Sequence, residues 1–193
     1  MDTKIAFVTA GSRHTLCLDV NGKLWYFGAK EGVGIFSNEK KMQFEPILLD
    51  SESQQQQQSF EKGFTLIDAG DSVNIALSAD DQSVYCFGKR ILDETLRKKS
   101  LGKTYAWENE YDDVGGAPDE DSKVHSTTFD KISMKACYVS CGLEHCIIID
   151  QDNFIPLSWG DNANYRCGQK QLGYFEEPVA VKPFPKLFKQ ENI

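Results

Sequence analysis

Three copies of one short pattern bounded by glycines constrain the fold of this chain more than any other feature of its sequence. Each copy begins with a short apolar stretch that ends in glycine and finishes with an aromatic-rich stretch that also ends in glycine. The paired glycines are Gly11 and Gly28, Gly70 and Gly88, and Gly142 and Gly160, lying 17, 18 and 18 residues apart. The first glycine recurs after 59 and then 72 residues. A constant unit with variable spacers predicts a repeat architecture with insertions in its loops.

The residues between the two glycines of each copy predict a β-hairpin. Apolar and polar residues first alternate with the period of a half-buried strand. Residue types that tolerate a positive φ then occupy the position of a tight turn, and an aromatic-rich strand follows. The alternating apolar residues are Leu16 and Leu18, Ile75 and Leu77, and Ile147 and Ile149, and the turns are Asn21-Gly22, Asp80-Asp81 and Asp152-Asn153. The chain is therefore expected to be all-β, with repeat cores at residues 5–36, 64–90 and 136–175.

The glycine that opens each copy is expected to have a backbone role. Gly11, Gly70 and Gly142 each stand at the entrance of a predicted strand. A glycine at such a position supplies either a positive φ or room for another backbone to approach closely. Both roles stay open at the level of the sequence.

The spacers between the copies differ in charge. Residues 37–63 and 91–131 are expected to be loop insertions, the first with a polar tip at Gln54 to Gln58. In the second, Asp93 is placed to cap a short helix that runs to Ser100. A basic stretch and then an acidic stretch in this insertion form the candidate partner-binding loop. Its candidate contact residues are Arg97, Lys98, Lys99, Asp112, Asp113, Asp119, Glu120 and Asp121.

Length and charge narrow the class of protein. A chain of 193 residues fits a single domain with a real core, and no apolar run is long enough to span a membrane. The net charge of −8 argues against binding a nucleic-acid backbone directly. Six cysteines without a secretory signal indicate reduced thiols. We expect an intracellular protein, cytoplasmic or nuclear, and no cofactor.

The repeat resembles that of the regulator of chromosome condensation family. The resemblance rests on Gly11-x-x-His14, Gly22 and Leu24-Trp25-x-Phe27-Gly28 in the first copy, and on Trp159-Gly160-Asp161-Asn162, Gly168 and Gln171-Leu172-Gly173 in the third. It covers about half of the chain and implies a β-propeller. The family closes rings of about seven blades. Three copies therefore imply a partial propeller of three to four blades, either open or completed by a partner. The second copy departs from the pattern, since Val73 stands in place of the histidine.

Several chemical readings of the repeat compete with a structural one. His14 and His145 occupy equivalent positions, which favours packing or a turn hydrogen bond over acid–base catalysis. A zinc site at Cys137, Cys141, His145 and Cys146 is disfavoured, because the sequence has no C-x-x-C spacing. A phosphate loop at Gly28, Gly32 and Gly34 has the wrong spacing. The aromatics beside the closing glycines are expected to fill the wedges between blades, with partner anchoring as the alternative. They are Trp25, Tyr26, Phe27, Phe87 and Trp159.

Three functions remain open from the sequence. The first is a non-catalytic interaction module or scaffold subunit that presents loops to protein partners. The resemblance implies the second, a guanine-nucleotide exchange factor for a small GTPase. The third is a regulatory propeller fragment of a larger enzyme. Each function predicts protein partners, either a small GTPase or subunits of a larger complex, and no membrane.

Overall fold

The computed structural model describes residues 3–35, 42–49, 62–71, 73–88 and 129–181. These residues form eleven β-strands and two short 3-10 turns, and the described parts of the chain contain no α-helix. The strands are β1 (Ile5–Ala10), β2 (His14–Asp19), β3 (Leu24–Ala29), β4 (Met42–Leu48), β5 (Phe64–Ala69), β6 (Asn74–Ser78), β7 (Ser83–Phe87), β8 (Asp130–Cys141), β9 (His145–Asp150), β10 (Pro156–Asp161) and β11 (Tyr174–Ala180). The 3-10 turns are η1 (Lys30–Val33) and η2 (Ala163–Tyr165).

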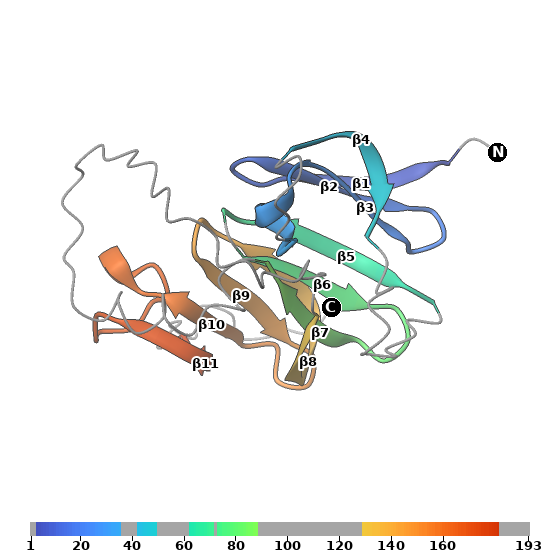
Figure 1. The fold of residues 1–193 in the computed structure, drawn as a ribbon. Helices are drawn as coiled ribbons and strands as arrows, with labels where there is room; N and C mark the ends of the chain where they lie inside the picture. The colour runs from blue at the N-terminus through green and yellow to red at the C-terminus, as the bar shows by residue number, and fades with distance from the viewer. Residues whose placement is uncertain (1–2, 36–41, 50–61, 72, 89–128, 182–193) are drawn as a thin grey trace, which may run out of the picture.

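The strands form three antiparallel blades of four strands each. One sheet has the order β1-β2-β3-β4, and the other has the order β11-β10-β9-β8-β7-β6-β5. The second sheet contains two blades because β8 is long enough to serve both. Its first half pairs with β7, and its second half, from Ala136, pairs with β9. We call these units the first, second and third blades; Figure 1 shows them following one another in chain order.

Each blade is built around the hairpin that the repeat predicts, and the structure confirms the three turns. β2 pairs with β3, β6 with β7, and β9 with β10. A side-chain oxygen on the last residue of each leading strand accepts the backbone N–H two residues later. These contacts are Asp19 to Asn21 at 2.8 Å, Ser78 to Asp80 at 3.1 Å, and Asp150 to Asp152 at 2.7 Å. Such bonds fix the chain reversal locally, so a short stretch of sequence is sufficient to specify it.

The core lies between blades rather than within them. Residues of the first blade such as Leu16, Leu18 and Tyr26 pack against Ile67 and Phe87 of the second. The other face of the second blade packs against the third through a separate cluster. That cluster includes Ile75, Leu77, Val84, Cys86, Val139, Cys146, Ile148, Leu157 and Trp159. Burial of these side chains is the main stabilising contribution to the arc.

The predicted wedge packing holds for three of the five aromatic residues. Tyr26, Phe87 and Trp159 are buried in the clusters between blades. Trp25 and Phe27 are only half-buried, although they belong to the same repeat pattern. Their exposure reflects their position in the first blade, whose outer face no described blade covers.

Two predicted loop insertions contain strands, which corrects the prediction. β4 lies within residues 37–63, and β8 begins at Asp130, inside residues 91–131. Both supply the fourth strand of a blade. The glycine pattern marks only the first three strands of a blade. β4 is largely exposed, so the sequence there lacks the alternation of apolar and polar residues that marks a half-buried strand. The polar run at residues 54–58 and the helix predicted from Asp93 to Ser100 lie outside the described residues.

Candidate functional site

The three blades approach most closely at the glycines that open the repeats. A β-carbon added to Gly11 would lie 2.5 Å from the carbonyl oxygen of Gly70. One added to Gly70 would lie 2.3 Å from the carbonyl oxygen of Gly142. None of the three has a positive φ. Of the two roles predicted for these glycines, the structure therefore shows close approach of the backbones.

A backbone hydrogen bond joins each pair of neighbouring blades beside these glycines. The amide of Ser12 donates to the carbonyl of Gly70 at 3.3 Å, and the amide of Asp71 donates to the carbonyl of Leu143 at 2.9 Å. A larger residue at the glycines would push the blades apart and break these bonds. The repeat glycines thus set the spacing of the arc.

Asp68 links all three blades through its carboxylate. Oδ1 accepts the Thr9 hydroxyl of the first blade at 2.7 Å. Oδ2 accepts the Ser140 hydroxyl at 2.8 Å and the Cys141 amide at 2.7 Å, both from the third blade. Burial would raise the pKa of Asp68, but these hydrogen bonds outweigh burial and lower it. The carboxylate is therefore held ionised as a joint between blades.

His14 forms the second polar link between blades. Its Nε2 lies 2.7 Å from Oδ1 of Asn74 in the second blade. The Asn74 amide nitrogen donates to the carbonyls of Gly32 and Phe87, so Oδ1 accepts a hydrogen bond from the N–H at Nε2 of the histidine ring. The ring also fills the space that a β-carbon on Gly11 would need. This arrangement explains why glycine and histidine occur together in the motif and favours a structural role for His14.

The other two copies show what happens when this link is incomplete. In the second copy Val73 occupies the histidine position, since its carbonyl accepts the amide of Gly70 as the His14 carbonyl accepts that of Gly11. In the third copy the His145 ring lies against Gly142 in the same way. Its Nδ1, like that of His14, is buried without a hydrogen-bond partner among the described residues. The two copies differ at Nε2, which in His14 bonds to Asn74 of the next blade and in His145 has no equivalent partner among the described residues. His145 stands where a fourth blade would follow.

The stability of the protein is expected to fall as the pH drops below neutrality. Burial lowers the pKa of His14, and burial together with Arg166 lowers that of His145. The unfolded chain therefore takes up protons near pH 6.5, before the folded chain does, and acid favours unfolding. Urea unfolding at several values between about pH 7.5 and pH 5.5 measures the slope of the free energy of unfolding against pH. His14→Gln should reduce it, because glutamine can still donate to Asn74 but cannot be protonated. An unchanged slope would contradict the assignment.

The residues considered for metal and phosphate chemistry lie in the third and first blades. Within the described residues, no three or more His, Cys, Asp or Glu side chains are grouped so that they could hold a metal ion. Cys137 is exposed, whereas Cys146 is buried. Gly32 accepts the Asn74 amide through its carbonyl, and Gly34 closes η1 with a φ of 82°. This glycine-rich segment supports the first blade.

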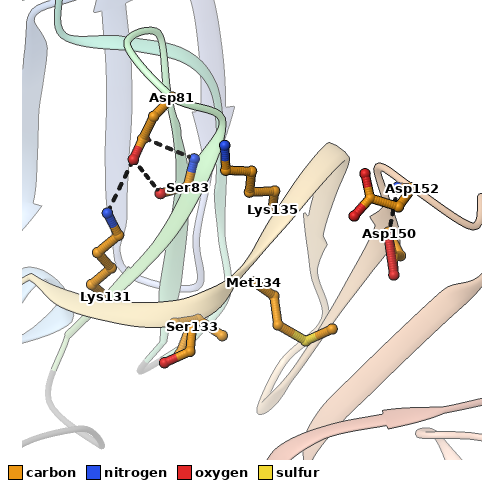
Figure 2. A pocket seen from close by; sticks show the side chains of 9 residues that line it. Asp81, Ser83, Lys131, Ser133, Met134, Lys135, Asp150 and Asp152 are labelled. Carbon is orange, nitrogen blue, oxygen red and sulfur yellow. Dashed lines mark hydrogen bonds and ion pairs between the residues drawn. The ribbon is translucent and has the colours of Figure 1, made fainter.

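A pocket of about 460 Å³ lies where β8 passes from the second blade to the third. Figure 2 shows Lys131 joined to Asp81 and the Ser83 hydroxyl bonded to the same carboxylate. Lys135, Asp150 and Asp152 line its other side. The hydrogen bonds that Asp81 accepts, chiefly those from Ser83, hold its pKa well below its usual range. Its lining is mixed in charge, so the pocket does not define a ligand class.

The first blade has an open outer face, which we call the trailing face, formed by Val8, Trp25 and Phe27. The equivalent positions in the second and third blades are covered by the preceding blade. Val8 is 56% exposed, whereas its equivalents Ile67 and Val139 are 2% and 4% exposed. The difference is the absence of a preceding blade among the described residues, because all three side chains are apolar and β-branched.

The third blade has the complementary open face, which we call the leading face, formed by Ile147 and Ile149. Both side chains are partly exposed. Their equivalents, Leu16 and Leu18 in the first blade and Ile75 and Leu77 in the second, are all buried against the following blade. The described arc therefore presents half of a blade-to-blade interface at each end.

Sequence reasoning missed the polar residues that join the blades. Asp68 and Asn74 carry links between blades and were not singled out. Asn162, which belongs to the repeat motif of the third copy, is buried and organises the loop after β10. The Asn162 amide donates to the carbonyls of Gln169 and Gln171 and its oxygen accepts the Cys167 amide. One signal was available for Asp68: Thr9 and Ser140 occupy the same repeat position, so a polar residue recurs two places before each glycine.

The candidate residues of the predicted partner-binding loop, from Arg97 to Asp121, lie outside the described residues.

The residues of the repeat signature all lie within the described residues. Gly22 lies in the first hairpin turn. Gly28, Gly88 and Gly160 each lie next to the last residue of an aromatic strand, with φ values of 106°, 129° and 104°. The described residues include no helix that is long and apolar enough to cross a membrane.

Comparison with known proteins identifies the fold. No family model and no curated protein matches the sequence. Among solved structures, human WBSCR16 matches with a TM-score of 0.62 and 14% identity, over 93% of this chain and 42% of that chain. Yeast RCC1 (Prp20), solved bound to Kap60, matches with a TM-score of 0.60 and 18% identity, over 93% and 37%. Prp20p of Saccharomyces cerevisiae, from a structural study of its binding to Gsp1p and histones, matches with a TM-score of 0.60 and 18% identity, over 93% and 38%.

Proposed function

We propose that this chain, an arc with the β-propeller fold of the regulator of chromosome condensation type, is a non-catalytic protein-interaction module. Its leading and trailing faces take further blades of the same kind. The observation that carries the proposal is the exposure of Val8, Ile147 and Ile149 at positions that are buried wherever a neighbouring blade is present. An apolar face of this kind is expected to be covered in the working assembly.

The two interfaces within the arc indicate what would cover its ends. Each buries apolar side chains of one blade against the inner strands of the next. Each also adds polar links near the repeat glycines, such as the Asp68 carboxylate. A further blade carries the same surfaces, whereas an unrelated protein would have to reproduce both the shape and the polar contacts. The arc spans under half the length of the propellers it matches, which leaves room for further blades.

The test is purification of the full chain with its bound protein, comparing matched variants. Ile147→Asp and Val8→Asp each place a charge on one open face, and each is expected to abolish recovery of the partner. Phe154→Asp is the control, since Phe154 is equally apolar and 72% exposed but lies in the β9–β10 turn. It should retain the partner. The proposal fails if all three variants recover the same proteins as the wild type, or if the recovered partner contains no propeller blades.

Exchange-factor activity is a distinct outcome that the same protein preparations can address. The structural study of Prp20p concerns its binding to Gsp1p and histones, which are both proteins. For this chain we propose only the same kind of partner, namely a protein. An exchange factor would accelerate release of a fluorescent nucleotide from a small GTPase. An interaction module without catalytic activity leaves the release rate unchanged, with the arc alone or with its partner.

A further inference from the structure

We propose that Cys141 and Cys146 form a reversible disulfide across the β8–β9 hairpin, making this corner of the third blade a site of oxidative modification. The two thiols are separate in the structure, with their sulfur atoms 3.5 Å apart. The site lies between the second and third blades, next to the carboxylate of Asp68. Its formation does not depend on the proposed partner.

The strand register places these cysteines directly opposite each other. Cys141 pairs with Cys146 in the antiparallel ladder. The adjacent pair, Gly142 and His145, is hydrogen-bonded, since the Gly142 amide donates to the His145 carbonyl at 2.8 Å. Hydrogen-bonded and non-hydrogen-bonded pairs alternate along such a ladder, so the cysteines form a non-hydrogen-bonded pair. In agreement, the Cys141 amide donates to Asp68 instead of to β9.

A non-hydrogen-bonded pair has a geometry that suits a disulfide. Its Cα atoms are about 4.5 Å apart, and disulfides span Cα distances of about 4.4–6.8 Å. The sulfur atoms must then approach from 3.5 Å to about 2 Å, which rotation of the two side chains can achieve without moving the strands. The ladder therefore holds the thiols ready for oxidation.

The environment gives the two cysteines different parts in the reaction. Cys141 is partly exposed, whereas Cys146 is buried and in contact with the thiol of Cys86 in the second blade. A small disulfide reagent therefore reaches Cys141 first. The Cys141 thiolate attacks one sulfur of the reagent and releases a thiolate. The Cys146 thiolate then attacks the Cys141 sulfur and releases the second thiolate. The protons of the two cysteines pass to the released thiolates, and two electrons pass to the reagent.

The thiols are expected to react slowly near neutral pH. Burial raises the pKa of Cys141, and the hydrogen bond to Cys141 is the first of the causes that raise the pKa of Cys146. Little thiolate is present at neutral pH as a result, and thiolate is the form that attacks a disulfide. Exchange should accelerate as the pH is raised.

The test is disulfide mapping of the full chain after equilibration with reduced and oxidised glutathione at about pH 8.5. Acid quenching, alkylation and digestion with trypsin and a glutamate-specific protease separate the two cysteines, because Glu144 lies between them. The expected product is peptide 136–144 joined to peptide 145–166. A product joining 145–166 to the Cys86 peptide, or no linked peptide, would overturn the proposal.

Three serine variants identify the sulfur atoms in that product. Peptide 136–144 also contains the exposed Cys137, so Cys137→Ser must keep the linked product and Cys141→Ser must lose it. Cys86→Ser must also keep it. Thermal unfolding of each variant checks that its fold is intact. If Cys141→Ser does not fold, the mapping of Cys137→Ser and Cys86→Ser still decides which pair forms.

Discussion

Asp68→Ala is expected to lower the free energy of unfolding by about 2–3 kcal/mol, although the residue lies in no apolar cluster. Removing the carboxylate leaves the Cys141 amide and the hydroxyls of Thr9 and Ser140 without their acceptor. A buried donor that loses its partner costs about 1–3 kcal/mol, and the hydroxyls can recover part of this by turning to water. Urea unfolding at neutral pH measures the loss.

Asp152→Ala is the matched control for this prediction. Asp152 is an exposed carboxylate in the β9–β10 turn, and its backbone N–H, which bonds to Asp150, remains after the substitution. The Asp152→Ala substitution should change the free energy of unfolding by no more than about 0.5 kcal/mol. Equal effects of the two substitutions would show that Asp68 does not join the blades.

The pH gives a second check on Asp68. Because the folded state lowers the pKa of this carboxyl, its contribution to stability is present above the unfolded pKa of about 3.9. That contribution is lost as the pH falls further. Measured relative to its own stability at pH 7, the wild type should therefore lose more stability below about pH 4 than a variant with the joint removed, because the variant lacks this carboxyl and its pH-dependent contribution.

Ile75→Ala and Ile147→Ala are expected to differ by severalfold in their effect on stability, although the two residues occupy the same repeat position. Ile75 is fully buried between the second and third blades, so truncation should cost about 3–4 kcal/mol. Ile147 lies on the leading face and should cost about 1 kcal/mol when the chain is alone. Urea unfolding of the two variants provides the comparison.

The same pair of variants reports on completion of the propeller. When a further blade covers the leading face, Ile147 becomes equivalent to Ile75, and the two losses should converge. Equal losses in the isolated chain would instead show that the leading face is already covered, which would contradict the open arc.

Much of the fold was predictable because its information is local. The apolar alternation at Leu16 and Leu18 predicts a strand. The turn after it reverses the chain through hydrogen bonds between residues that are two positions apart in the sequence. The fourth strands were not predictable in this way. β4 carries no glycine signature, and β8 became a strand of two blades only through pairing with β7 on one side and β9 on the other.

The candidate site was less predictable than the fold. The sequence indicated His14 and the repeat glycines, but their partners lie 59 or more residues away in the chain. The residues next to Asn74 in the sequence do not show that its side-chain oxygen accepts a hydrogen bond from the His14 ring. Those next to Asp68 do not show that its carboxylate accepts the Ser140 hydroxyl. The zinc hypothesis named Cys141 and Cys146, whose thiols the structure places opposite each other, but no three or more His, Cys, Asp or Glu side chains of the described residues are grouped so that they could hold a metal ion.

The hairpin, its repetition and the positions where backbones meet can therefore be read from the amino acids alone, because period, turn chemistry and the absence of a β-carbon act over a few residues. Which polar groups join the blades, and which apolar faces are left open, depends on the folded arrangement. Burial and hydrogen bonding between blades depend on neighbours that are distant in the chain. Val8 and Ile67 are both apolar β-branched residues at one repeat position, and only the presence of a preceding blade distinguishes them.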